Sequence, residues 1–136
     1  MSRRRSKIGT IGCTTITELD AKGRGVGVFR DRPIHVPATL PGEDIRFRIS
    51  GQRRRAFEGE LVDLYRPAGN RVRSHCAHFF SCGGCSFQHL DIEAQRALKM
   101  AHLRAQFDAV GVALPPLSPP IVGPDWGYRR SARLAA

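Results

Sequence analysis

The stretch that decides the fold is residues 8–29, which read IGTIGCTTITELDAKGRGVGVF. Its first half, Ile8–Leu19, is rich in isoleucine and threonine and alternates between two faces, as β-strands do. Its second half has glycine at positions 23, 25 and 27, so one face of the next strand carries no side chains. Such a face lets another backbone approach closely. We therefore expect two adjoining strands of a sharply coiled sheet.

Further short strands are expected before residue 66. The pattern predicts strands at Pro33–Pro37, Ile45–Ile49 and Phe57–Tyr65, joined by a turn at 41–44 and a basic loop at 51–55. Five short strands at this spacing are typical of an OB-like barrel, which closes its edges and binds oligonucleotides. We assign residues 1–66 to such a barrel and expect a mainly β fold.

The next region is a small cysteine-rich segment that ends in one α-helix, and we assign it to residues 67–114. The helix is expected over about residues 92–110, because Asp91 is a good N-cap and Gly111 a good stop. One helical stripe is expected to make core contacts, and it consists of Met100, Leu103, Phe107 and Val110.

The remaining residues are expected to form a linker and the beginning of another domain. Residues 115–125 are rich in proline and predict a stiff extended linker. Residues 126–136 alternate apolar and basic side chains, which predicts an incomplete strand. An exposed lone strand is an aggregation hazard, so we expect the natural fold to continue past Ala136.

The charge of the chain indicates a polyanionic partner. The formal net charge is +10, with 14 basic and 8 acidic residues before Pro67 and 8 basic and 4 acidic residues from it onward. An excess spread over both halves favours nucleic acid, although a merely basic soluble surface is the alternative. The candidate RNA contacts are Arg46, Arg48, Arg53, Arg54, Arg55, Arg129 and Arg130.

Targeting signals are absent from the sequence pattern. No apolar run approaches the roughly 20 residues that span a bilayer. The basic stretch Met1–Lys7 is not followed by an apolar region, as a signal peptide would require. We therefore expect no membrane partner and a cytoplasmic location, where cysteines are metal ligands or core residues more often than disulfides.

Three of the four cysteines lie within ten residues, as Cys76-x5-Cys82-Gly-Gly-Cys85. Thiolates bind soft metals, and the two glycines let backbone N–H groups approach cluster sulfurs. Cys13 lies in an expected strand and is interpreted as a core residue. The identity of the metal stays open: an iron–sulfur cluster needs four ligands, whereas zinc would be served by the three cysteines with His89.

Several stretches resemble a known enzyme family. Residues 8–66 resemble a TRAM domain, a small RNA-binding barrel, in the strand Gly25–Val28 and the turn Leu40–Glu43. The stretch Cys76–Leu90, with Gln95 and Lys99, resembles the iron–sulfur segment of bacterial RNA uracil-5-methyltransferases. Trp126–Arg130 resembles the start of that family's central domain.

The resemblance implies a 4Fe–4S cluster held by four cysteines, three of which correspond to Cys76, Cys82 and Cys85. It also implies methyl transfer from S-adenosylmethionine to C5 of a uridine in ribosomal or transfer RNA. In the family the catalytic residues and the S-adenosylmethionine site lie in a C-terminal Rossmann-like domain, and the fourth ligand lies beyond the point where this chain stops. We therefore expect a truncated, RNA-binding region that is inactive alone, with a separate catalytic portion as partner if the enzyme is split.

Two other hypotheses remain. The chain is a stand-alone RNA-binding module with a structural zinc site, or it is an electron-carrying iron–sulfur protein. Colour distinguishes the metals, because an iron–sulfur protein is brown and a zinc protein is colourless. The barrel favours RNA binding over electron transfer.

Overall fold

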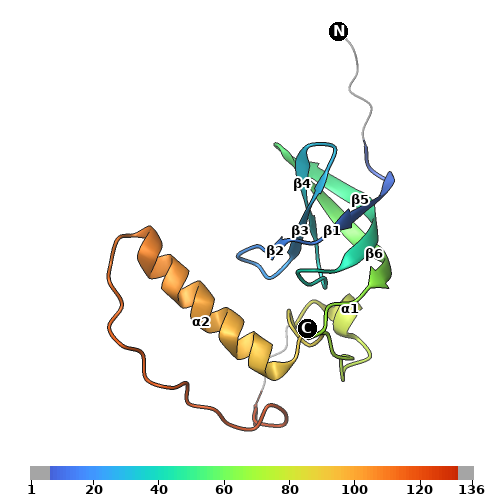
Figure 1. Cartoon of the computed structure of the whole chain (residues 1–136). Coiled ribbons are helices and arrows are strands. Elements are labelled where there is room, and N and C mark those ends of the chain that lie inside the picture. Colours follow the sequence, from blue (N-terminus) through green and yellow to red (C-terminus); the bar gives the residue numbers. More distant parts are fainter. Residues whose placement is uncertain (1–6, 132–136) are drawn as a thin grey trace. The chain divides into compact units, whose positions relative to one another are not determined.

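The computed structural model describes residues 7–131 and divides into two units, Met1–Asp91 and Ile92–Ala136. The strands lie in the first unit, and the long helix lies in the second (Figure 1). The boundaries expected at residues 66 and 114 stay predictions. The structure groups residues 67–91, called here the cysteine segment, with the barrel, and it separates them from the helix that follows.

The described strands form a barrel-like sheet. They are β1 (Ile11–Thr15), β2 (Glu18–Leu19), β3 (Gly25–Phe29), β4 (Arg32–Val36), β5 (Asp44–Arg53) and β6 (Ala56–Arg66). Their order is β1-β5-β6-β4-β3-β2, and only β4 and β6 pair in parallel. Because β1 and β2 are consecutive pieces of the chain, their positions at the two ends of this order bring the edges of the sheet together. The expected mainly β, barrel-like fold is confirmed.

The glycine-rich face of β3 is where the sheet closes. The hydroxyl of Thr14 on β1 donates to the carbonyl of Val28 at 2.9 Å, and the Val28 N–H donates to the same hydroxyl oxygen at 3.2 Å. A Cβ atom at Gly27 would lie 2.7 Å from the Thr14 side chain, and one at Gly25 would lie 2.0 Å from the Thr39 hydroxyl. The close approach expected from the alternating glycines is therefore present.

The barrel is filled by apolar side chains from β4, β5 and β6 and from the link between β1 and β2. The buried cluster consists of Ile16, Ile34, Val36, Ile45, Phe47, Ile49 and Phe57. Gly12 faces this interior, since a Cβ there would lie 2.8 Å from the Phe47 ring. Its neighbour Cys13 consequently faces outward and is exposed, so the interpretation of Cys13 as a core residue was wrong.

Two parts of the barrel differ from the expectation. The first strand is divided at residues 16–17, because its early part pairs with β5 and its late part with β3. The basic loop expected at 51–55 is mostly strand: Arg53 pairs with Ala56, which leaves a two-residue turn. In the longer β5, Gln52 pairs with Phe57, and the ring of Phe57 is fully buried in the core. Register shifts along β5 and β6 accommodate the coiling of this long hairpin.

The second unit contains α2 (Ile92–Ala109) and an irregular chain. The helix ends as expected at Gly111, which has φ of 70°. The N–H of Gly111 donates to Asp108 at 3.0 Å and that of Val112 donates to Phe107 at 3.1 Å, which is a Schellman motif. The expected core stripe was wrong, since no residue of α2 is buried and Val110 is 72% exposed. Among its described residues this unit has no second layer for the stripe to pack against.

The expected C-terminal strand is also absent from the described residues. Residues 126–131 form no strand, and residues 132–136 of that prediction lie outside the description. A strand needs a hydrogen-bonded neighbour, and the described part of this unit has none. Within residues 7–131, no helix combines the length and the apolar character required to cross a membrane.

Candidate functional site

The cysteine segment is attached to the barrel by a buried ion pair. Glu43, in the turn before β5, is fully buried. Its carboxylate accepts hydrogen bonds from the Leu40 N–H at 2.8 Å and the Ala68 N–H at 3.2 Å. The Arg71 guanidinium donates to both carboxylate oxygens, from Nε at 2.5 Å and from Nη2 at 3.0 Å. The Glu43 carboxylate therefore holds both the start of the cysteine segment, at Ala68, and the first arginine of that segment, Arg71.

The charge of Glu43 is stabilised by these contacts. Burial acts to raise the pKa of Glu43, but hydrogen bonds from Arg71, Leu40 and Ala68 and the charge of Arg71 outweigh it, so the pKa is lowered. The sequence placed Glu43 only in a turn. Its partner lies 28 residues away, and no local pattern indicates such a pair.

The two ends of the cysteine segment run beside each other. The Val72 N–H donates to the His89 carbonyl at 2.9 Å, and the Asp91 N–H donates to the Asn70 carbonyl at 3.0 Å. These bonds close a loop that contains all three motif cysteines.

A second contact between segment and barrel involves Gly23, in the turn before β3. A Cβ atom there would lie 2.4 Å from the Phe87 ring, and the backbone φ is 75°. Both facts require glycine at this position, because any side chain would displace the ring and would strain the backbone. The ring of Phe87 is therefore docked on the barrel and is half-buried there.

His89 stands at the closing end of this loop, and its side chain is buried at 1% exposure. Its ring lies 5.3 Å from the Phe79 ring, centroid to centroid, and among the described residues neither ring nitrogen has a hydrogen-bond partner of good geometry. Burial and the nearby charge of Arg71 lower the pKa of His89 to about 4, although Glu43 and the backbone of Thr39 offset this in part. The imidazole is therefore neutral at pH 7.

The motif cysteines occupy different positions around the short helix α1 (Phe79–Cys82). The Cys82 N–H donates to the His78 carbonyl at 2.8 Å, and Gly83 ends the helix with φ of 72°. The Cys76 N–H donates to the side-chain oxygen of Gln88 at 3.2 Å. The thiols of Cys82 and Cys85 are exposed and that of Cys76 is half-buried, and all three are free.

The donor set suits a soft metal, but the described residues do not form a finished site. Within residues 7–131, no three side chains of the Cys, His, Asp and Glu types lie together as a metal-binding group. The structure therefore does not bring the three cysteines together, and it does not bring His89 to them.

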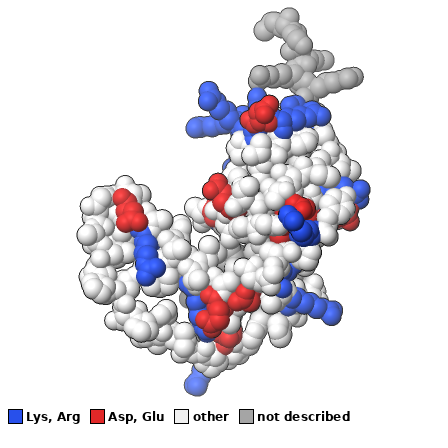
Figure 2. All heavy atoms as spheres, viewed as in Figure 1, with Lys and Arg blue, Asp and Glu red and all other residues white. Residues whose placement is uncertain are grey.

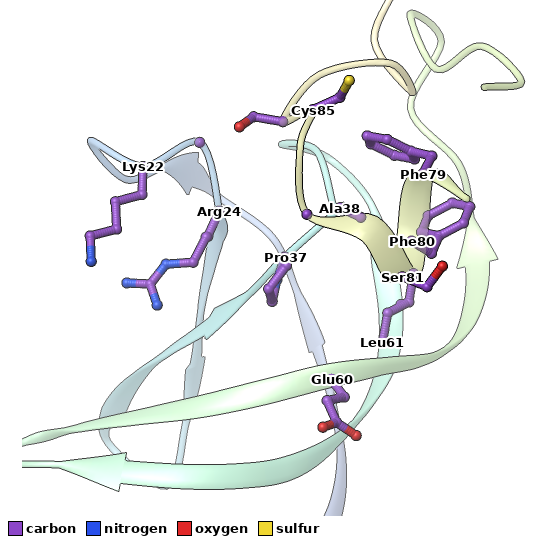
Figure 3. Close-up of a pocket in the computed structure, with 13 residues that line it drawn as sticks. Lys22, Arg24, Pro37, Ala38, Glu60, Leu61, Phe79, Phe80, Ser81 and Cys85 are labelled. Atoms are coloured by element: carbon purple, nitrogen blue, oxygen red, sulfur yellow. The ribbon is translucent and has the colours of Figure 1, made fainter. Parts of the chain in front are cut away.

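A cleft of about 470 Å³ lies between the barrel and the cysteine segment (Figure 3). Lys22 and Arg24 line it on the barrel side, and Phe79 and Phe80 line it on the segment side. Its charge is mixed, because Arg24 pairs with Asp20 at 2.8 Å and the exposed Glu60 also lines the cleft. Since it is not strongly cationic, the cleft does not by itself indicate a phosphate site.

The predicted RNA-binding arginines fall in three places. Arg46 and Arg48 lie on the outer face of β5, where Arg46 pairs with Asp63 and Arg48 is exposed. The group Arg53–Arg55 lies at the β5–β6 turn, and Arg53 is 81% exposed although it pairs with Glu58 at 3.3 Å. The pair Arg129–Arg130 is exposed in the second unit.

Comparison with known proteins identifies the relatives of this chain. No protein-family model matches it. The 23S rRNA (uracil(1939)-C(5))-methyltransferase RlmD of Alkalilimnicola ehrlichii is 43% identical over 121 residues, which cover 88% of this chain and 27% of that protein. The enzymes of the same name from Methylococcus capsulatus and Vibrio vulnificus are 41% and 35% identical, over 84% and 88% of this chain.

The chain is homologous to 23S rRNA uracil-5-methyltransferases. This confirms the resemblance to RNA uracil-5-methyltransferases that the cysteine motif and the barrel pattern indicated. The chain spans only about a quarter of the length of the methyltransferases that it matches, 26% to 27% in these three cases.

Proposed function

We propose that this chain is the RNA-binding N-terminal portion of an RNA uracil-C5 methyltransferase that acts on ribosomal RNA. The observation that carries the proposal is the 35–43% identity, over at least 84% of the chain, to enzymes named as 23S rRNA uracil-5-methyltransferases. The barrel-like sheet with exposed arginines gives physical support, because such barrels bind nucleic acid on an open surface. The TRAM assignment of the barrel belongs to the same proposal.

RNA binding by the barrel is tested with the chain as it is. If the barrel neutralises three to five phosphates, log affinity for single-stranded RNA should fall with log salt at a slope of about −2 to −4. The variant Arg53→Ala/Arg54→Ala/Arg55→Ala should flatten this slope, since it removes three exposed cations. The control Lys99→Ala/Arg104→Ala, in α2, should leave it unchanged. Absence of RNA binding by the wild type at low salt would contradict the proposed function.

The proposal includes a 4Fe–4S cluster held by Cys76, Cys82 and Cys85, with a fourth ligand from outside these residues. It is supported by three free thiols within one loop and by glycines that leave the backbone beside Cys82 uncovered. Because the thiols are not gathered, we expect the loop to rearrange when a cluster binds, and a cluster in this chain alone to be labile. When bound, such a cluster would crosslink the segment.

Anaerobic reconstitution, with visible absorption and iron counting, tests the cluster. Cys82→Ser and Cys85→Ser should each abolish brown colour, whereas Cys13→Ser should retain it, because Cys13 lies on the outer face of β1. A colourless protein with one zinc, lost in the His89→Ala variant, would replace the cluster with a zinc site. The RNA-binding proposal would survive that outcome.

We further propose that the chain alone transfers no methyl group and that S-adenosylmethionine binds the remaining part of the enzyme. This is supported by the chain's match to only about a quarter of its relatives' length. Incubation with labelled S-adenosylmethionine and unmodified 23S rRNA should give no incorporation above a blank without protein. Incorporation above that blank would show that the chain carries its own catalytic site.

A further inference from the structure

The strand pairing brings two hairpin turns to the same end of the barrel. β4 and β6 pair in parallel, with Ile34 opposite Phe57. The turn that precedes β4 and the turn that precedes β6 must therefore lie side by side. Both turns and the strand residues that flank them are basic: Arg30 and Arg32 lie at the first turn, and Arg53–Arg55 lie at the second. In the view of Figures 1 and 2 this is the upper end of the barrel, where Lys and Arg side chains flank a small acidic group.

Aromatic rings contact three of the cations at this end of the barrel. The Arg30 guanidinium lies 5.1 Å from the centre of the Phe29 ring, and that of Arg32 lies 5.8 Å from the centre of the Phe57 ring. The ammonium of Lys7 lies 5.3 Å from the same Phe57 ring. The two rings are neighbours, with centroids 6.1 Å apart. Such cation–π contacts hold each cation in place without neutralising its charge.

Few carboxylates of residues 7–131 oppose these cations. Within the same residues, six basic side chains belong to this end, namely Lys7, Arg30, Arg32, Arg53, Arg54 and Arg55. The acidic residues beside them are Asp31, in the first turn, and Glu58, which pairs with Arg53 at 3.3 Å and with Arg24 at 3.8 Å. Like charges gathered in this way repel one another, and a bound polyanion would relieve that repulsion.

We propose that the two turns and Lys7 form one phosphate-binding end of the barrel, which grips the RNA backbone without reading its bases. This deepens the proposed function and rests on it. Phe57 is fully buried and Phe29 is half-buried under Arg30, so these rings support cations and do not stack on bases. Contacts to phosphates carry no sequence information, so selection of the target uridine falls to other parts of the enzyme.

Salt-dependent binding of the whole chain to labelled single-stranded RNA tests the proposal. The variant Arg30→Ala/Arg32→Ala removes two cations, so the slope of log affinity against log salt should become shallower by about 1.4. The variant Arg30→Lys/Arg32→Lys keeps both charges and should keep the slope. The control Arg66→Ala/Arg73→Ala also removes two cations, from the last residue of β6 and from the segment that follows it, and should have no effect. Circular dichroism checks that each variant keeps its strands.

The outcomes separate the two proposals. If the wild type binds RNA but Arg30→Ala/Arg32→Ala leaves affinity and slope unchanged, the first turn does not take part and this inference fails, while the proposed function stands. The affinity for a scrambled RNA of equal length and composition should be within about threefold of that for the original RNA, because this end of the barrel contacts only phosphates. A larger sequence preference would overturn the claim that the bases are not read. If the wild type binds no RNA at low salt, the proposed function fails first.

Discussion

The barrel and the cysteine segment belong to one unit, yet different forces hold them. In the barrel, seven large apolar side chains are buried at 0% or 1% exposure. In the segment, only Phe79 and Leu90 are buried apolar side chains among the described residues, and its attachment depends on Glu43 and Arg71. Burying a large apolar side chain contributes about 1.5–3 kcal/mol, so the barrel has many independent sources of stability. The segment has few, and we expect it to loosen before the barrel does.

The largest effect is expected from Phe47→Ala, which would damage both regions. Phe47 is fully buried and contacts Phe29 edge to face at 5.2 Å. Truncation leaves a cavity at the centre of the barrel and should cost about 3–5 kcal/mol in the free energy of unfolding. Urea unfolding followed by circular dichroism measures this. Val28→Ala is the control, because Val28 is 62% exposed and its loss should cost no more than about 0.5 kcal/mol.

Glu43→Gln should destabilise the cysteine segment more than the barrel. The variant leaves Arg71, whose side chain is only 14% exposed, without a charged partner. We expect a loss of about 3 kcal/mol, the lower end for a buried pair that loses one member. Limited proteolysis should then cleave residues 67–91 well before the barrel strands. The double variant Glu43→Gln/Arg71→Met removes the unpaired charge and should recover part of the loss. Equal cleavage of segment and barrel in Glu43→Gln would contradict their separate stability.

The difference between the barrel and the cysteine segment also explains which features could be predicted from the sequence. The barrel strands were predictable because apolar alternation and the glycine row of β3 are local patterns that burial requires. The β3–β4 turn was not predicted, because Arg30 and Asp31 both have positive φ, 50° and 59°, without the glycine or asparagine that usually marks such turns.

The candidate site was predicted only in part, for a related reason. Spacing alone identified Cys76, Cys82 and Cys85, but it does not determine where a loop places its thiols. The two basic turns become neighbours only through the parallel pairing of β4 with β6, which joins residues about twenty positions apart. The prediction for α2 failed in the opposite way. The helix and its apolar residues are present, but the described part of its unit has no second element to cover them.

A smaller loss of stability is expected when the pH is lowered, and it should arise from His89 in the cysteine segment. His89 has a pKa of about 4 when folded, against an ordinary value of 6.5. The unfolded chain therefore binds a proton more readily than the folded chain, and stability should fall as the pH decreases from 6.5 towards 4. In His89→Leu the stability should vary less over this range. His102→Leu is the control, because His102 is exposed on α2 and should leave the pH dependence as in the wild type.

This acid effect must be separated from that of Glu43. Because the pKa of Glu43 is lowered in the fold, its contribution is present above the ordinary value of 4.5 and is lost as the pH falls through the folded pKa. Unfolding measured between pH 7 and pH 5 therefore reports mainly on His89. A wild-type stability that is flat over this interval would contradict the burial of a neutral imidazole.

The smallest effect is expected from Gly83→Ala, which should alter the segment alone. Gly83 has φ of 72° at the end of α1, a conformation that costs a residue with a Cβ about 1 kcal/mol. The Cys82 N–H, which donates to the His78 carbonyl at 2.8 Å, should then exchange with solvent about fivefold faster, because about 1 kcal/mol shifts the opening equilibrium by that factor. Gly84→Ala is the matched control: Gly84 is not among the described glycines with positive φ, and a Cβ there would meet the Cys82 sulfur at an acceptable 3.4 Å. Hydrogen exchange measured by NMR should show the change in Gly83→Ala alone, with exchange in β5 and β6 unaltered. Faster exchange in those strands as well would show that the segment and the barrel open together.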